Sequence, residues 1–213
     1  MEMEKPYVIG IDMGGTNTVF GIVDARGNVV AKGAIKTDNP DIDAYILDLK
    51  TELDKQIESV GGIDKIKGIG AGCPNGNFYT GNIEFAPNLP WKGVVPFAKL
   101  LSDSFGVPAA ITNDANAAAV GEMTYGVARG MKNFIMITLG TGVGSGIVID
   151  GKIVYGHDGF AGELGHVNVV RNNGRMCGCG RTGCLEAYTS ATGVARTARE
   201  ILEMSKTPSS LRT

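Results

Sequence analysis

One histidine and three cysteines lie close together within residues 166–184. An imidazole and three thiolates form a ligand set that closed tetrahedral Zn²⁺ sites use. Glycines at 178, 180 and 183 allow the backbone to turn tightly enough for the sulfurs to converge on one ion. The alternative is a disulfide or buried thiols, but an odd number of cysteines argues against it. We therefore predict a zinc site made of His166, Cys177, Cys179 and Cys184.

Because protein ligands would fill all four positions, we expect the ion to be structural. The same stretch contains a G-x-G-x-x-G pattern at 178–183, which we discard because no predicted strand precedes it. Two carboxylates, Glu163 and Glu186, flank the ligands. They are either surface acids or, together with His166, hydrogen-bond acceptors for a polyhydroxylated ligand.

Length and composition narrow the class of protein. The chain has 213 residues, of which 43% are hydrophobic, so it can bury a substantial core in one large or two smaller domains. A net charge of −2 and a pI of about 5.7 argue against nucleic-acid binding. No apolar run approaches the roughly 18 residues that span a bilayer, and residues 1–5 do not resemble a signal peptide. We expect a cytoplasmic protein that does not bind membranes.

Apolar alternation and helical periodicity predict an α/β protein. A strand, a turn of glycine and threonine, and a second strand occur twice, which suggests two domains with bounds near 1–115 and 116–213. The segment 72–93, rich in Pro, Gly and Asn, is expected to be an irregular excursion, and 207–213 to be weakly structured. The predicted strands are 7–12, 18–24, 29–35, 66–71, 107–112, 134–139 and 146–149, and the predicted helices are 41–60, 94–105, 115–123 and 193–205.

The two turns are candidates for phosphate binding. Glycines in a turn expose backbone N–H groups that can bind anions, and Asp12 could hold Mg²⁺ or its waters beside a phosphate. The alternative is an ordinary hairpin turn, since Asp and Gly favour turns for local reasons. A second turn of the same chemistry strengthens the phosphate interpretation, although neither is a Walker A loop. The turns contain Gly14, Gly15 and Thr16 in the first case and Gly140, Thr141 and Gly142 in the second.

Asn113 and Asp114 follow a predicted strand and precede an alanine-rich helix. Both residue types cap helix N-termini well, which is the simpler interpretation. An aspartate at such a position is also the usual general base for a hydroxyl that attacks a γ-phosphate. We interpret His157 and Cys73, which lack partners in the sequence, as structural.

In their order and spacing these motifs resemble the ROK family, named for repressors, ORFs and kinases. The resemblance is carried by the two turns, by N-D-A-N-A-A-A-V-G-E at 113–122, by E-L-G-H at 163–166 and by C-x-C-G-x-x-G-C-L-E at 177–186. It implies the actin-like, ribonuclease H-like ATPase fold, with two domains around a cleft. Family members are usually longer, so we expect this chain to have an incomplete second domain and to lack part of the adenosine contacts.

The resemblance also implies an activity, the transfer of the γ-phosphate of ATP to the 6-hydroxyl of a hexose. Glucose is the favoured hexose, with N-acetylmannosamine and fructose as alternatives, and ATP, Mg²⁺ and structural Zn²⁺ are the implied cofactors. Asp114 would be the catalytic base, while Asn17 stands where many relatives carry lysine. The implied sugar contacts are Asn88, Asn113, Asp114, Glu163, His166 and Glu186, and the implied nucleotide contacts are Asp12, Gly14, Gly15, Thr16, Asn17, Gly140, Thr141 and Gly142.

Two other classes of protein share these motifs. A sugar-responsive repressor needs an N-terminal winged helix-turn-helix, for which a first strand at about Tyr7 leaves no room. A sugar sensor without catalysis is the second alternative, and Asn17 keeps it open. Because relatives commonly dimerise, the resemblance also implies a homodimer.

Overall fold

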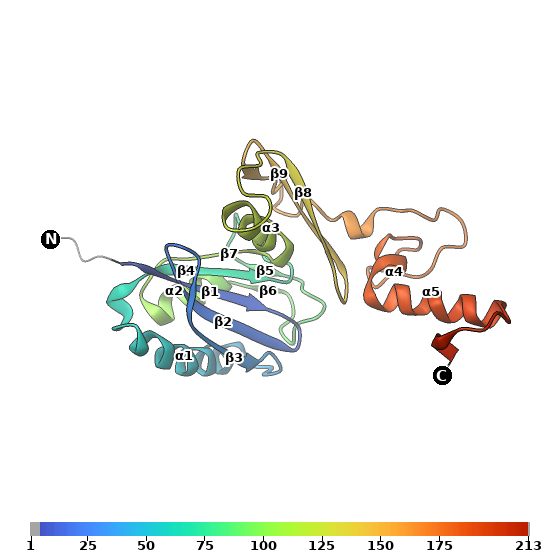
Figure 1. Ribbon diagram of the computed structural model, residues 1–213. Helices are drawn as coiled ribbons and strands as arrows, with labels where there is room; N and C mark the ends of the chain where they lie inside the picture. Colours follow the sequence, from blue (N-terminus) through green and yellow to red (C-terminus); the bar gives the residue numbers. More distant parts are fainter. Residues whose placement is uncertain (1–4, 213) are drawn as a thin grey trace.

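The computed structural model describes residues 5–212, and its two larger sheets lie on either side of one helix (Figure 1). The larger sheet has five strands in the order β3-β2-β1-β4-β7. β1 runs antiparallel to β2 and parallel to β4, and β4 runs parallel to β7. Its strands are β1 (Tyr7–Met13), β2 (Asn17–Asp24), β3 (Val29–Lys36), β4 (Ile66–Cys73) and β7 (Ala109–Asn113).

The parallel strands of this sheet bring polar residues to one edge. Asp12, near the end of β1, is in register with Gly72 of β4, and Cys73 at the end of β4 is in register with Asn113 of β7. Carboxyl ends of parallel strands meet at the same sheet edge, and this edge is where open α/β sheets bind ligands. The sequence order alone does not reveal this proximity.

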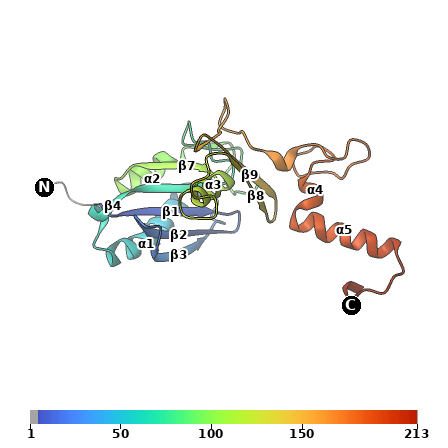
Figure 2. The ribbon, with the colours of Figure 1, turned by 45° about the horizontal axis from the view of Figure 1, so that its top comes forward.

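Two helices, α1 (Ile42–Ser59) and α2 (Phe97–Phe105), cover one face of the larger sheet (Figures 1 and 2). The apolar positions of α1 recur with helical spacing, and Asp41 caps its N-terminus by accepting from two backbone N–H groups. Together with the sheet these helices form one continuous core. Its fully buried members on the helices include Tyr45, Leu49, Leu53, Phe97 and Leu101.

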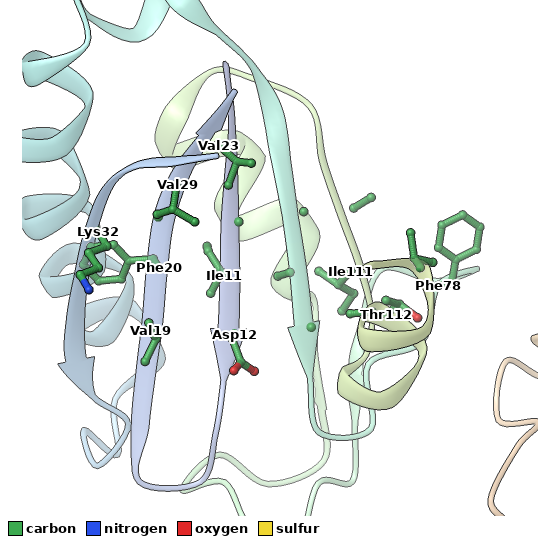
Figure 3. Close-up of a pocket in the computed structure, with 18 of the residues that line it drawn as sticks. Ile11, Asp12, Val19, Phe20, Val23, Val29, Lys32, Phe78, Ile111 and Thr112 are labelled. Atoms are coloured by element: carbon green, nitrogen blue, oxygen red, sulfur yellow. The ribbon is translucent and has the colours of Figure 1, made fainter. Parts of the chain in front are cut away.

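The opposite face of the larger sheet carries an apolar groove of about 640 Å³ (Figure 3). Val19 and Val29 point into it and keep 49% and 60% of their surface exposed. Asp12 lies at one end of the groove and α3 borders its side (Figure 3). The apolar groove is therefore adjacent to the acidic edge of the sheet.

Helix α3 (Asp114–Thr124) packs against both sheets, touching β4 on one side and β9 on the other. Its alanines meet glycines of these strands. A Cβ atom added at Gly72 would lie 3.1 Å from Ala117 Cβ, and one at Gly146 would lie 2.7 Å from Ala119 Cβ. Small residues on both sides thus bring the helix close to the strands, and the predicted domain boundary at residue 115 falls inside this shared helix.

Replacing Gly146 with valine should therefore destabilise the protein, because its side chain has no space beneath α3. We expect a loss of about 1–3 kcal/mol in the free energy of unfolding, as in other overpacked cores. The matched control is Gly121→Ala, which lies in α3 itself and where an added Cβ meets nothing within 4 Å. Alanine is the better helix former by about 0.5–1 kcal/mol, so that variant should be more stable. Urea denaturation of both variants measures the two effects, and a harmless Gly146→Val would show that the contact with α3 is loose.

The smaller sheet has the order β10-β9-β8, with β8 (Phe134–Leu139), β9 (Val143–Ile149) and β10 (Lys152–Ile153). Within residues 5–212, β8 has β9 as its single strand partner and is therefore an edge. Three large apolar side chains on its outer face remain exposed: Ile135 at 56%, Ile137 at 49% and Leu139 at 68%. A short hairpin, β5 (Ile83–Glu84) with β6 (Val94–Val95), lies in the excursion between β4 and α2.

Helices α4 (Glu186–Thr189) and α5 (Ala191–Met204) lie apart from the larger sheet (Figures 1 and 2). Arg175 ties the cysteine-bearing loop to them. Its guanidinium donates to the carbonyls of Ala187 and Gly193 and pairs with Glu200 at 2.5 Å. The sequence did not predict a role for this arginine, whose side chain is only 10% exposed.

The structure corrects several predicted bounds. Residues 94–95 form strand β6, and α2 begins only after Pro96, because a proline disfavours the helical conformation in the residue that precedes it. β9 begins at Val143, so the second turn is shorter than predicted. The last helix begins at Ala191, and the segment expected to be weakly structured contains a short turn of helix, Ser210–Arg212. Of the helices in residues 5–212, none is both long and apolar enough to cross a membrane.

Candidate active site

The candidate site is centred on the edge where β1, β4 and β7 end. Burial, and then the negative charge of Asp114, raise the pKa of Asp12 above its ordinary value. Burial also raises the pKa of Cys73, and the charges of Asp114 and Asp12 add to this effect. The Cys73 thiol is therefore neutral beneath two carboxylates, which fits its predicted structural role. An acid near the end of β1 and one at the start of α3 thus influence each other here, and such perturbed pKa values are common at functional sites.

The first turn, residues 14–16, joins β1 to β2 and is held from both sides. Gly14 N–H donates to the carbonyl of Asn17 at 3.0 Å, and Thr37 N–H donates to the carbonyl of Thr16 at 3.0 Å. An added Cβ at Gly15 would lie 2.9 Å from the backbone oxygen of Asn88. The structure thus brings Asn88 to the first turn, while Asn17 is the first residue of β2 and not part of the turn.

Asn113 and Asp114 occupy the junction of β7 and α3. Asn113 caps the helix, because its Oδ1 accepts from Ala115 N–H at 2.9 Å. Asp114 is the first helical residue, and one of its carboxylate oxygens accepts from the same N–H at 2.8 Å. The capping interpretation is therefore correct for Asn113. The other oxygen of Asp114 remains available for a ligand in the protein as described.

The second turn, residues 140–142, is fixed by the region that follows the cysteines. Gly140 N–H donates to the carbonyl of Gly142 at 3.0 Å, and the carbonyl of Gly140 accepts from Ala191 N–H at 2.9 Å. Val143 N–H, at the start of β9, donates to Glu186 Oε2 at 2.9 Å. The implied sugar contact Glu186 therefore already uses one carboxylate oxygen for the main chain of the turn.

The four predicted metal ligands converge. One ligand atom from each lies within 4.8 Å of the others. His166 Nδ1 is 3.7 Å from Cys177 Sγ, and the sulfurs of Cys179 and Cys184 are 3.7 Å apart. A tetrahedron with Zn–S bonds of about 2.3 Å has S–S edges of about 3.8 Å, so the donor set and its spacing suit that ion. The other ring nitrogen of His166 lies 4.0 Å from Glu163 Oε2, which is beyond hydrogen-bond distance, so the nearest carboxylate is close to the imidazole without being bonded to it.

Cys179 is prepared to bind as a thiolate. Hydrogen bonds from the backbone and then the side chain of Arg181 lower its pKa to about 6. The guanidinium of Arg181 also donates to the carbonyl of His166 at 3.2 Å. Arg181 thus links two of the candidate ligands. Because a metal binds deprotonated sulfur, the lowered pKa of Cys179 favours metal binding.

Glu163 connects this cluster to the sheet edge. Burial raises its pKa, His166 opposes that shift, and the charges of Asp114 and Glu186 add to it. Glu163 Oε2 lies 4.0 Å from His166 Nε2, and Glu186 Oε1 lies 3.7 Å from Cys177 Sγ, so both glutamates flank the cysteine cluster. The predicted sugar contacts Glu163 and Glu186 therefore lie beside the cluster, and the charge of Asp114 acts on Glu163.

One buried polar residue that joins two distant loops was not predicted. Asn77, 3% exposed, donates to the carbonyl of Asp158 at 2.9 Å and accepts from Tyr79 N–H at 3.0 Å. Tyr79 in turn donates to the carbonyl of Gly156 at 3.0 Å. These bonds join the excursion after β4 to the loop after β10. The sequence signal was an Asn-Gly-Asn run, which reads only as a turn because its partners lie far along the chain.

The mixed five-stranded sheet, the second sheet across α3 and the glycine-rich turn in each sheet are the arrangement of the actin-like ATPase fold. The model of the ROK family matches residues 8–211, and the chain belongs to this family.

Three relatives illustrate the range of similarity. The chain is 42% identical over 204 residues to a glucokinase of Halalkalibacterium halodurans, an alignment that covers 93% of this chain and 61% of the relative. It is 32% identical over 202 residues to the xylose repressor of Caldicellulosiruptor bescii, covering 92% of this chain and 49% of the repressor. The crystal structure of a ROK family glucokinase from Streptomyces griseus with glucose and AMPPNP superposes with a TM-score of 0.77 at 34% identity, covering 93% of this chain and 62% of that one. The chain therefore spans about three fifths of the glucokinases.

Proposed function

We propose that the full-length protein is an ATP-dependent hexose kinase that phosphorylates the 6-hydroxyl of glucose. The observation that carries the proposal is the position of Asp114, which directly follows β7 at the sheet edge where β1 and β4 also end and where Asp12 lies. A base at this junction can face a sugar on one side and a phosphate on the other. The similarity to glucokinases supports the same reaction.

In this mechanism Asp114 accepts the proton of the sugar hydroxyl as its oxygen forms a bond to the γ-phosphorus. The bond between that phosphorus and the bridging oxygen of ADP breaks, and ADP leaves with its negative charge. In the turns 14–16 and 140–142 the N–H groups of Gly14 and Gly140 are used within the turn, and the other backbone N–H groups would donate to the phosphate oxygens. Donors that are fixed before the reaction stabilise the charge that develops in the transition state.

Two ions complete the proposal. Asp12 would hold Mg²⁺, which neutralises charge on the nucleotide phosphates when bound. Zn²⁺ would be held by His166, Cys177, Cys179 and Cys184 and would have a structural role. His166 would bind the ion through Nδ1, and its other ring nitrogen, on the side of Glu163, would contact the sugar. A cytoplasmic homodimer is part of the same proposal.

The test is a coupled assay for ADP formation with the full-length protein, ATP and one sugar at a time. Glucose should give the highest kcat/KM, with N-acetylmannosamine and fructose as comparison substrates. Identification of the product by NMR should place the phosphate on the 6-hydroxyl. A higher kcat/KM for another hexose would correct the substrate, and absence of sugar-dependent turnover would contradict the kinase proposal.

A sugar-binding regulator without catalysis is the second candidate. It is favoured by the match to a xylose repressor across 92% of this chain. The discriminating result is binding of a sugar, measured by calorimetry, in a full-length protein that does not hydrolyse or transfer phosphate from ATP.

A further inference from the structure

Glu186 lies between the second turn and the cysteine cluster and contacts both. Its Oε2 accepts from Val143 N–H at 2.9 Å, although the two residues are 43 positions apart in the sequence. Its Oε1 lies 3.7 Å from Cys177 Sγ. A carboxylate that accepts from a backbone N–H forms a charge-assisted hydrogen bond, which is among the stronger contacts a turn can make.

The shape of the turn is adapted to this carboxylate. An added Cβ at Gly142 would lie 2.7 Å from Glu186 Oε2, so a side chain at that position would displace the acid. The far end of the turn is tied to the same region, because the carbonyl of Gly140 accepts from Ala191 N–H at 2.9 Å. Both ends of residues 140–143 therefore depend on the start of α4 and of α5.

The cysteine cluster in turn fixes the position of Glu186 at the start of α4. Ala187 N–H donates to the carbonyl of Cys184 at 3.1 Å, so one candidate metal ligand caps the first turn of α4. The segment that carries His166 presses on the turn from the other side, since an added Cβ at Gly165 would clash with the carbonyl of Val143. Any movement of the cluster would be transmitted to Val143 by two routes.

We propose that Glu186 is a positioning residue that fixes the conformation of the turn 140–143 and makes this conformation depend on the cysteine cluster. The inference deepens the proposed function, on which it rests for the role of the turn in binding phosphate. A carboxylate that only contacted sugar would not need this bond to the main chain. Loss of Glu186 should therefore weaken nucleotide binding as well as sugar binding.

Hydrogen exchange measured by mass spectrometry tests the inference without any assay of activity. In the zinc-loaded 213-residue chain, Glu186→Ala should speed exchange of the Val143 amide about tenfold, the effect of losing one charge-assisted hydrogen bond. Glu186→Gln keeps a carbonyl oxygen that can accept the same N–H, so exchange should return to within about threefold of the unmodified protein. The matched control is Glu163→Ala, an acid beside the same cluster with no contact to the turn.

Removal of zinc by a chelator from the unmodified protein should reproduce the faster exchange of Val143. Peptides from β1 report on global unfolding, and their exchange should not change in either glutamate variant. Exchange of Val143 that is unaffected by Glu186→Ala, or that rises equally in Glu163→Ala, would overturn the positioning role. Exchange that responds to Glu186→Ala but not to the chelator would overturn the dependence on the cluster.

Nucleotide affinity of the full-length variants separates this inference from the proposed function. If both hold, Glu186→Ala raises the Kd for a non-hydrolysable ATP analogue about tenfold and Glu186→Gln restores it. An exchange response without any phosphoryl transfer in the unmodified protein would leave the positioning role standing and contradict the kinase. A normal Kd for the analogue in Glu186→Ala would contradict the effect of the turn on phosphate binding.

Discussion

The Asp114→Ala variant of the full-length protein is expected to lose phosphoryl transfer while it still binds glucose. Removal of a general base costs about 10²–10⁴ in rate, and we expect kcat to fall about 10³-fold. The Kd for glucose should rise by no more than about fivefold, the loss of one hydrogen bond. Steady-state kinetics with a coupled assay and calorimetric titration with glucose measure the two quantities.

The structure explains why this variant should fold. Asn113 caps α3 through Ala115 N–H, so the helix keeps its N-terminal cap when the neighbouring carboxylate is removed. Removal also relieves the electrostatic repulsion that acts on Asp12. The matched control is Asp103→Ala, an exposed acid on α2 that pairs with Lys99 and should leave kcat unchanged. Equal losses of glucose binding and turnover would show that Asp114 only binds the sugar.

Removal of one candidate metal ligand should release zinc and loosen the C-terminal part of the chain. In Cys184→Ser, zinc measured by mass spectrometry should fall from one equivalent per chain to less than about 0.2. Cys184 is buried, and its carbonyl accepts from Ala187 N–H at the start of α4, so loss of the ion should loosen that helix and Tm should fall by roughly 5–10 °C, equivalent to about 2–3 kcal/mol for a domain of this size. Differential scanning calorimetry measures the shift.

Cys73→Ala is the control for this experiment. Cys73 is fully buried in the core of the larger sheet and lies outside the cluster. Its replacement should cost about 1 kcal/mol through the cavity it leaves, with zinc content unchanged. Retention of one equivalent of zinc in Cys184→Ser would contradict the tetrahedral assignment.

Much of the larger sheet could be predicted because its strands have strong local patterns. Alternating apolar residues from Tyr7 to Met13 and a glycine turn after Asp12 leave few alternatives to a hairpin, and the structure confirms it. The convergence of His166 with the three cysteines was also predictable, since unusual side chains recur within one short stretch. In both cases the deciding interactions lie near one another in the sequence.

The remaining features depend on contacts between distant residues. Helix α4 has four residues, too few to show a helical period, and the bond from Val143 to Glu186 spans 43 positions. A glycine can also be required for more than one structural reason. Those of the second turn were predicted to expose backbone to phosphate, whereas Gly146 nearby makes space for Ala119 of α3. Composition cannot separate these causes, because each requires only that the side chain be absent.

The open edge of β8 has a consequence for work with this chain. In the larger sheet the corresponding first strand, β1, has a parallel partner on its far side, but in the part of the chain that the structure describes β8 has none. Its free backbone groups and the exposed Ile135, Ile137 and Leu139 form a template on which a strand from another molecule can add. The exposed edge therefore favours association between copies of these 213 residues. We expect single molecules at low concentration and assemblies at high concentration.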